Sequence, residues 1–202
     1  VDLFYEHPKM INLNPVFFLR GYHYLLESLY LIKDQKQLKE TLSKFEDVIS
    51  GEDFPKDDNI EVLSFQFLYN NKLNVHFLEG SFADGEYLVQ EIHKGILNYD
   101  DRLDDHHIMV FYYKIGCLYF GMGNHKKCIE YLKKIIDNKT LQMRQDLMCF
   151  ARVLSLVAHY ESGLDYHLDT QLRETYRFLI KMDDLHEVQK EMIKFLRNLG
   201  DI

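Results

Sequence analysis

Helical periodicity runs through this sequence from one end to the other, and no stretch shows the strict apolar–polar alternation of a strand. Only 3 prolines and 10 glycines interrupt the 202 residues, which favours helices joined by short connections. Hydrophobic residues make up 47% of the chain and charged residues 28%, a balance typical of globular proteins. The sequence therefore predicts an all-α fold with a substantial buried core.

The apolar residues divide into consecutive amphipathic stretches that end at polar or glycine-containing breaks. Asn14 followed by Pro15 predicts a helix start, because asparagine caps helices and proline is tolerated in the first turn. The segment 51–59, with a proline and several acids, predicts the clearest loop. Asp184 and Glu187 stand at capping-box spacing before the last stretch. We expect helix pairs over 14–50, 59–98, 106–138 and 144–182, and a closing helix over 184–199.

Residues 109–142 carry the most informative pattern, MVFYYKIGCLYFGMGNHKKCIEYLKKIIDNKTLQ. Gly116 and the small Cys128 predict a close approach of two helices, and Tyr112 and Tyr119 fill the space around that contact. The stretch resembles a tetratricopeptide repeat. The resemblance implies a right-handed superhelical stack of antiparallel helix pairs, a TPR-like α-α solenoid that buries its core between neighbouring units.

The likeness rests on several positions of this one repeat, and it departs from the family at Thr140, where proline is frequent. Aromatic residues that end the first helices recur about 41–47 residues apart, longer than the family period of about 34, so longer units are expected. We expect a single TPR-like domain over 1–202, and a fragment of a longer chain because the sequence begins at Val1. The matching positions are Tyr112, Ile115, Gly116, Tyr119, Gly123, Asn124, Cys128 and Leu132.

The resemblance also implies which side chains face a concave groove. Certain first-helix positions of the family line that groove, and tyrosine on a rigid helix offers a large contact area at small entropic cost. The alternative is that the same side chains only pack within the array. The predicted partner-binding residues are Tyr24, Asn71, Val110, Tyr113, Cys117 and Phe120.

The family's best-known peptide grip uses lysine and asparagine at groove positions to hold a C-terminal carboxylate. Tyr113 and Cys117 stand here where a lysine and an asparagine would be needed. The sequence therefore does not predict an adaptor for the C-terminal tails of chaperones.

Charge and composition exclude several classes of partner. A net charge of −8 argues against broad binding to nucleic acid, which depends on lysine and arginine. No apolar run approaches the roughly 20 residues needed to cross a bilayer, so no membrane partner is expected. The 3 cysteines lie in apolar helical patterns without metal-ligand spacing, which indicates free thiols in a reducing, cytoplasmic setting.

The segment 100–107 is the densest polar cluster, with four aspartates and two histidines. Carboxylates and imidazoles suit a divalent metal, but the segment lacks the glycine-punctuated spacing of a calcium loop and the spacing of HExxH. We expect a solvated loop whose acids stabilise the N-terminus of the next helix, and no metal.

No catalytic motif stands out. The sequence has no GxSxG, no phosphate-cradling glycine loop and no dinucleotide fingerprint, so we expect neither an enzyme nor a cofactor. The leading hypothesis is a non-enzymatic scaffold that binds a protein or peptide in a concave, partly aromatic groove. The alternative is a regulatory sensor, in which a bound peptide or ligand changes the curvature of the array and controls an attached domain.

Overall fold

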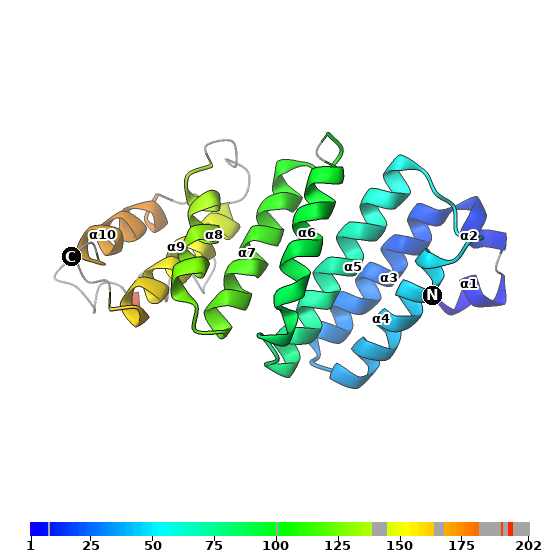
Figure 1. Cartoon of the computed structure of the whole chain (residues 1–202), viewed down its shortest axis with the longest axis horizontal. Helices are drawn as coiled ribbons and strands as arrows, with labels where there is room; N and C mark the ends of the chain where they lie inside the picture. Colours follow the sequence, from blue (N-terminus) through cyan, green and yellow to red (C-terminus); the bar gives the residue numbers. More distant parts are fainter. Residues whose placement is uncertain are drawn as a thin grey trace. The chain divides into compact units, whose positions relative to one another are not determined.

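The protein is described by a computed structural model (Figure 1). Throughout its described part, every regular element is a helix, which confirms the all-α class. The chain divides into two compact units, Val1–His107 (unit 1) and Ile108–Ile202 (unit 2). The single repeat domain and the right-handed superhelix stay predictions. The described residues are 1–7, 9–99, 101–138, 145–163, 168–181, 191, 194 and 195.

Unit 1 begins with two short helices and continues with long ones, at the positions expected for the pairs 14–50 and 59–98. The 22-residue helix α5 packs against both α3 and α4, and α6 packs against α5. The elements are α1 (Asp2–Glu6), α2 (Lys9–Leu13), α3 (Pro15–Leu31), α4 (Gln35–Ser50), α5 (Asp58–Glu79), the 3₁₀ turn η1 (Asp84–Glu86) and α6 (Tyr87–Asn98).

Side-chain caps fix where the long helices of unit 1 begin. The Asn14 side chain accepts a hydrogen bond from the backbone N–H of Phe17 at 3.3 Å, and Pro15 occupies the first turn, as the sequence predicts. Asp34 caps α4 in the same way, and Asp57 caps α5 by accepting from two backbone N–H groups at 2.9 Å. These contacts satisfy backbone donors that the first turn of a helix leaves free.

The core of unit 1 lies among α3, α4 and α5 and is rich in aromatic rings. The ring of Tyr22 lies 5.0 Å from that of Phe18 and 5.1 Å from that of Phe45, and all three side chains are buried. Phe54 joins them from the connection between α4 and α5, with its ring 5.9 Å from Phe18 and only 6% exposed. The predicted loop is therefore anchored in the core by its one aromatic residue.

Unit 2 contains the helices expected for the pairs 106–138 and 144–182. α8 packs against α9, and α9 packs against α10. The closing helix expected over 184–199, with its capping residues Asp184 and Glu187, lies outside the described residues except for three positions. The helices are α7 (Asp105–Gly121), which begins in the last residues of unit 1, α8 (His125–Ile136), α9 (Gln145–Glu161) and α10 (Leu168–Leu179).

Gly116 marks a close contact between α7 and α8, as the sequence predicts. A Cβ atom at this position would lie 3.0 Å from Leu132 Cδ2 and 3.7 Å from the carbonyl oxygen of Cys128. The rings of Tyr112 and Tyr119 flank the contact and lie 5.9 Å and 5.7 Å from Tyr131. Thr140, where the pattern departs from the family, lies outside the described residues.

Candidate functional site

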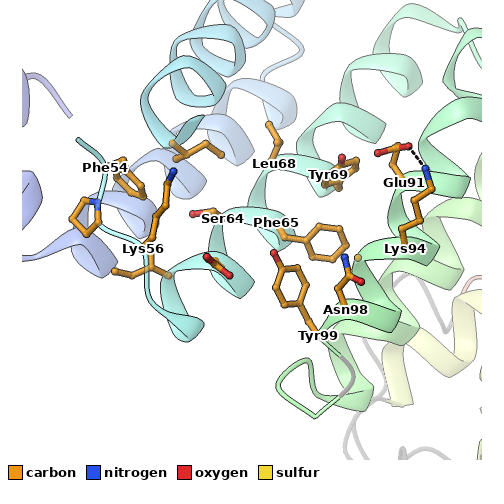
Figure 2. Close-up of a pocket in the computed structure, with 15 residues that line it drawn as sticks. Phe54, Lys56, Ser64, Phe65, Leu68, Tyr69, Glu91, Lys94, Asn98 and Tyr99 are labelled. Atoms are coloured by element: carbon orange, nitrogen blue, oxygen red, sulfur yellow. Dashed lines mark hydrogen bonds and ion pairs between the residues drawn. The ribbon is translucent and has the colours of Figure 1, made fainter. Parts of the chain in front are cut away.

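Unit 1 contains a pocket of about 520 Å³ bounded by the end of α4, the connection to α5, α5 itself and α6. Figure 2 shows Ser64 between Phe54 and Lys56 on one side and Phe65, Asn98 and Tyr99 on the other. Its lining mixes apolar side chains with charged ones. The lining residues are Ile49, Phe54, Pro55, Lys56, Ile60, Glu61, Ser64, Phe65, Leu68, Tyr69, Glu91, Lys94, Gly95, Asn98 and Tyr99.

Three aromatic side chains form a continuous row along the pocket, which we call the aromatic row. The ring of Phe65 lies 5.0 Å from that of Tyr69, one helical turn further along α5, and 5.3 Å from that of Tyr99 at the end of α6. The three rings are tilted against one another, an arrangement that aromatic pairs favour. The row therefore joins α5 to α6 by ring contacts.

Gly95 makes room for the central ring of this row. A Cβ atom at residue 95 would lie 2.0 Å from Phe65 Cε2 and 2.2 Å from Cζ, far closer than two carbon atoms can approach. Glycine in a helix interior costs about 1 kcal/mol relative to alanine, so this position trades helix stability for the space that the ring occupies. The ring and the glycine together set how closely α6 approaches α5.

A cation covers each end of the aromatic row. Lys72 Nζ lies 5.5 Å from the centre of the Tyr69 ring, and Arg102 Cζ lies 5.2 Å from the centre of the Tyr99 ring. Lys72 forms an ion pair with Glu46, while Arg102 Nη1 lies 2.7 Å from a carboxylate oxygen of Asp58. The Tyr69 and Tyr99 rings are thus each contacted by a cation on one face and by the Phe65 ring.

The polar groups of the pocket are neutral hydroxyls and charged side chains of both signs. Burial, followed by the charge of Glu91, raises the pKa of Tyr69, and burial followed by Glu61 raises the pKa of Tyr99. Both phenols therefore stay protonated at neutral pH. Lys94 donates to Glu91 at 3.1 Å, and the buried Ser64 Oγ has no hydrogen-bond partner within the described part of the chain. The pocket offers aromatic faces, one unsatisfied hydroxyl and both signs of charge.

The polar segment 100–107 is organised around a helix cap. Asp104 Oδ1 accepts from the backbone N–H of His107 at 2.9 Å and lies 2.6 Å from its Nδ1. Burial alone would raise the pKa of Asp104, but these bonds to His107 and its charge lower it. Among the described residues, which exclude Asp100, no group of three or more histidines, cysteines and acids could hold a metal ion.

The two predicted groove residues of unit 1 occupy opposite environments. Tyr24 on α3 is 64% exposed, whereas Asn71 on α5 has no exposed surface at all. The Asn71 amide donates to the carbonyl oxygen of Phe67 at 2.8 Å, and its own oxygen accepts from Asn74 at 3.3 Å. The sequence predicted Asn71 at a surface, but these bonds satisfy its polar atoms in the interior, so in this structure it offers a partner nothing to contact.

The four predicted residues on α7 are partly buried, and they remain unassigned as contact residues. The Tyr113 ring lies 6.5 Å from that of Phe150 on α9, and the Phe120 ring lies 5.4 Å from His125. Burial raises the pKa of Tyr113 and raises that of Cys117 to about 11, and the two side chains share a hydrogen bond. Val110 is likewise partly buried. None of the six predicted residues lines the unit 1 pocket.

None of the residues predicted from the sequence therefore belongs to this pocket, although two features of the sequence indicate it. Gly95 interrupts the interior of an expected helix, which is costly unless another group needs the space. Phe65 and Tyr69 stand four residues apart, the spacing that stacks side chains on one helix face. No feature of the sequence indicates that Phe54 lines the pocket, because it lies in a loop and the path of a loop follows no periodic pattern.

Comparison of the chain with models of protein families, with curated proteins and with solved structures finds no match.

Proposed function

We propose that the chain is a non-enzymatic interaction module that holds a segment of a partner protein, with the unit 1 pocket as its anchor point. The aromatic row carries the proposal, because it is fixed in the pocket wall by Gly95 and by the cations over its outer rings. Ligand-binding pockets combine apolar and aromatic walls with a few placed polar groups, and this pocket has that composition.

The charge of unit 1 favours a basic partner segment. Residues 1–107 include 20 aspartates and glutamates against 10 lysines and arginines. Such a balance attracts positively charged partners and repels negatively charged ones during encounter. We expect the segment to place an apolar side chain over Ser64 and Leu68, and to carry lysine or arginine on either side of it.

The TPR-like stack and its groove remain part of the proposal. The close contact at Gly116 supports the likeness of residues 109–142 to a tetratricopeptide repeat. In such a stack Tyr113 and Phe120 would provide a second contact surface. The three cysteines are free thiols, which suits the reducing cytoplasm as the proposed setting.

The test is selection of peptides from a displayed random-sequence library on the purified chain, followed by fluorescence anisotropy with the selected peptides. Ser64→Leu fills the floor of the pocket while leaving the aromatic row in place. We expect this variant to weaken binding about tenfold or more, a loss of about 1.4 kcal/mol. Ser43→Leu makes the same exchange at an exposed position of α4 outside the pocket lining, and serves as the matched control with an unchanged Kd.

Two further variants separate the pocket from the predicted groove. Tyr24→Ala and Phe120→Ala change groove residues that do not line the pocket. Unchanged binding by Ser64→Leu together with weakened binding by Phe120→Ala would replace the pocket with the groove as the binding surface.

A further inference from the structure

A second pocket lies within unit 2, between α8, α9 and α10, and has a volume of about 320 Å³. It differs from the first in that its described lining contains no phenylalanine or tyrosine and consists mostly of charged and polar side chains. Two of these are basic (Lys133 and Arg152) and two are acidic (Asp137 and Glu174). The lining residues within the described part are Ile129, Lys133, Ile136, Asp137, Arg152, Ser155, His159, Gln171, Glu174 and Thr175.

Arg152 is the group in this pocket whose bonding is incomplete. Its Nε is buried and has no hydrogen-bond partner among the described residues. Asp137 and Glu174 act on its charge from a distance, but in the described part neither forms an ion pair with it. The Phe178 ring supports the guanidinium from one face, with 4.8 Å between Cζ and the ring centre. A planar group with this much unused donor capacity matches a carboxylate, which accepts two parallel hydrogen bonds.

The polar neighbours of Arg152 satisfy one another and leave it as the open donor. His159 Nδ1 lies 2.7 Å from the carbonyl oxygen of Ser155, so this nitrogen carries the proton and donates. His159 Nε2 then accepts from the Gln171 amide at 3.1 Å. Both ring nitrogens of His159 are therefore engaged, and neither is left to accept a hydrogen bond from the guanidinium of Arg152.

We propose that this pocket binds a free α-amino acid, with the carboxylate on Arg152 and the ammonium group toward Asp137 and Glu174. The two acids favour a ligand that carries a positive charge beside its negative one, and they disfavour a multiply charged anion such as phosphate. A volume of about 320 Å³ is at the small end for ligand pockets and suits a single amino acid rather than a peptide. The proposal is independent of the unit 1 pocket.

The test is isothermal titration of the full chain with each of the common L-amino acids. For the tightest one, two analogues follow: the acid without its amino group and the amine without its carboxylate. We expect saturable binding of the amino acid, and each analogue to bind about tenfold more weakly or worse, because each leaves charged groups of the pocket unpaired. Inorganic phosphate and a tripeptide ending in the same residue complete the set of probes.

Variants locate the binding. Arg152→Met keeps much of the side-chain length but removes the guanidinium, and we expect about tenfold or greater loss of affinity. Arg173→Met, on the exposed side of α10, is the matched control and should keep the wild-type Kd. Without ligand, Arg152→Met should melt at or above the wild-type temperature, since it removes a buried donor that lacks an acceptor.

Three results would overturn the proposal. The first is an amino acid Kd that Arg152→Met leaves unchanged, with or without a lower melting temperature, because Arg152 would then be a packing residue. The second is tighter binding of phosphate or of the tripeptide than of any free amino acid. The third is the absence of saturable binding by all the amino acids at millimolar concentration.

Discussion

Units 1 and 2 are built from the same kind of helix but differ in charge and in the character of their pockets. Residues 1–107 hold 20 acidic against 10 basic side chains, whereas residues 108–202 hold 12 against 14. The unit 1 pocket is lined by a row of rings, and the unit 2 pocket by charged groups around an arginine. Both units thus share helical periodicity, while the lining of each pocket depends on which side chains meet where several helices come together.

The largest effect should come from the centre of the aromatic row. Phe65 is only 8% exposed and contacts two other rings, so Phe65→Ala should cost about 3–5 kcal/mol of unfolding free energy. Urea unfolding followed by circular dichroism measures this loss. A cost below about 1 kcal/mol would show that the row contributes little to unit 1, and would remove the contrast between a rigid aromatic pocket and a polar one.

Two buried glycines inside long helices, one in each unit, allow a direct comparison of the units. Gly95→Ala places a methyl group 2.0 Å from the Phe65 ring, and the resulting overpacking should cost about 1–3 kcal/mol despite the better helix propensity of alanine. Gly116→Ala meets Leu132 at 3.0 Å, where a small shift suffices, so its net cost should be near zero. The double variant with Phe65→Leu should recover part of the Gly95→Ala loss. Equal costs at the two glycines would contradict the comparison.

The partly buried rings of α7 should give intermediate effects. Tyr113→Ala and Phe120→Ala should each cost less than the roughly 3 kcal/mol typical of a fully buried ring. Tyr24→Ala, on an exposed side chain, should stay within about 0.5 kcal/mol of wild type. Thermal unfolding ranks the three. A cost above about 3 kcal/mol for both α7 variants would make those residues core, and would exclude them from a binding groove.

The smallest effect concerns a single acid of unit 1. Hydrogen bonds from Lys39 and Gln35 lower the pKa of Glu79 below its ordinary value of 4.5. A lowered pKa adds stability that is complete above about pH 4.5 and is lost as the pH falls through the folded-state pKa. Glu79→Gln should therefore cost under about 1 kcal/mol at pH 7, and the cost should shrink as the pH falls below the ordinary pKa of 4.5. A difference that does not change as the pH falls below 4.5 would assign the effect to packing instead.

The features that the sequence predicted correctly depend on short-range patterns. The helix start follows from the capping side chain of Asn14 and from Pro15 next to it. The contact at Gly116 joins two helices that follow one another directly in the sequence. The positions of the helices also follow the breaks in apolar periodicity. Such features are local, so a single sequence contains enough information to locate them.

The features that it missed depend on which groups come together in the folded chain. Asn71 reads as a polar surface residue, but a hydrogen bond to the carbonyl four residues earlier makes its burial possible. Phe54 lies in a polar loop, and its place in the core follows from where the ends of α4 and α5 meet. The two pockets arise where three or more segments come together, which periodicity along one helix does not reveal.

The fit of Gly95 against Phe65 has a consequence for how this chain can change over time. The two positions are 30 residues apart in sequence (95−65), yet neither can be exchanged freely while the other is kept. A gain of even one methyl group at 95 selects for a smaller side chain at 65, and a smaller ring at 65 releases 95 from being glycine. In an alignment of related sequences, we expect the residues at positions 65 and 95 to vary together.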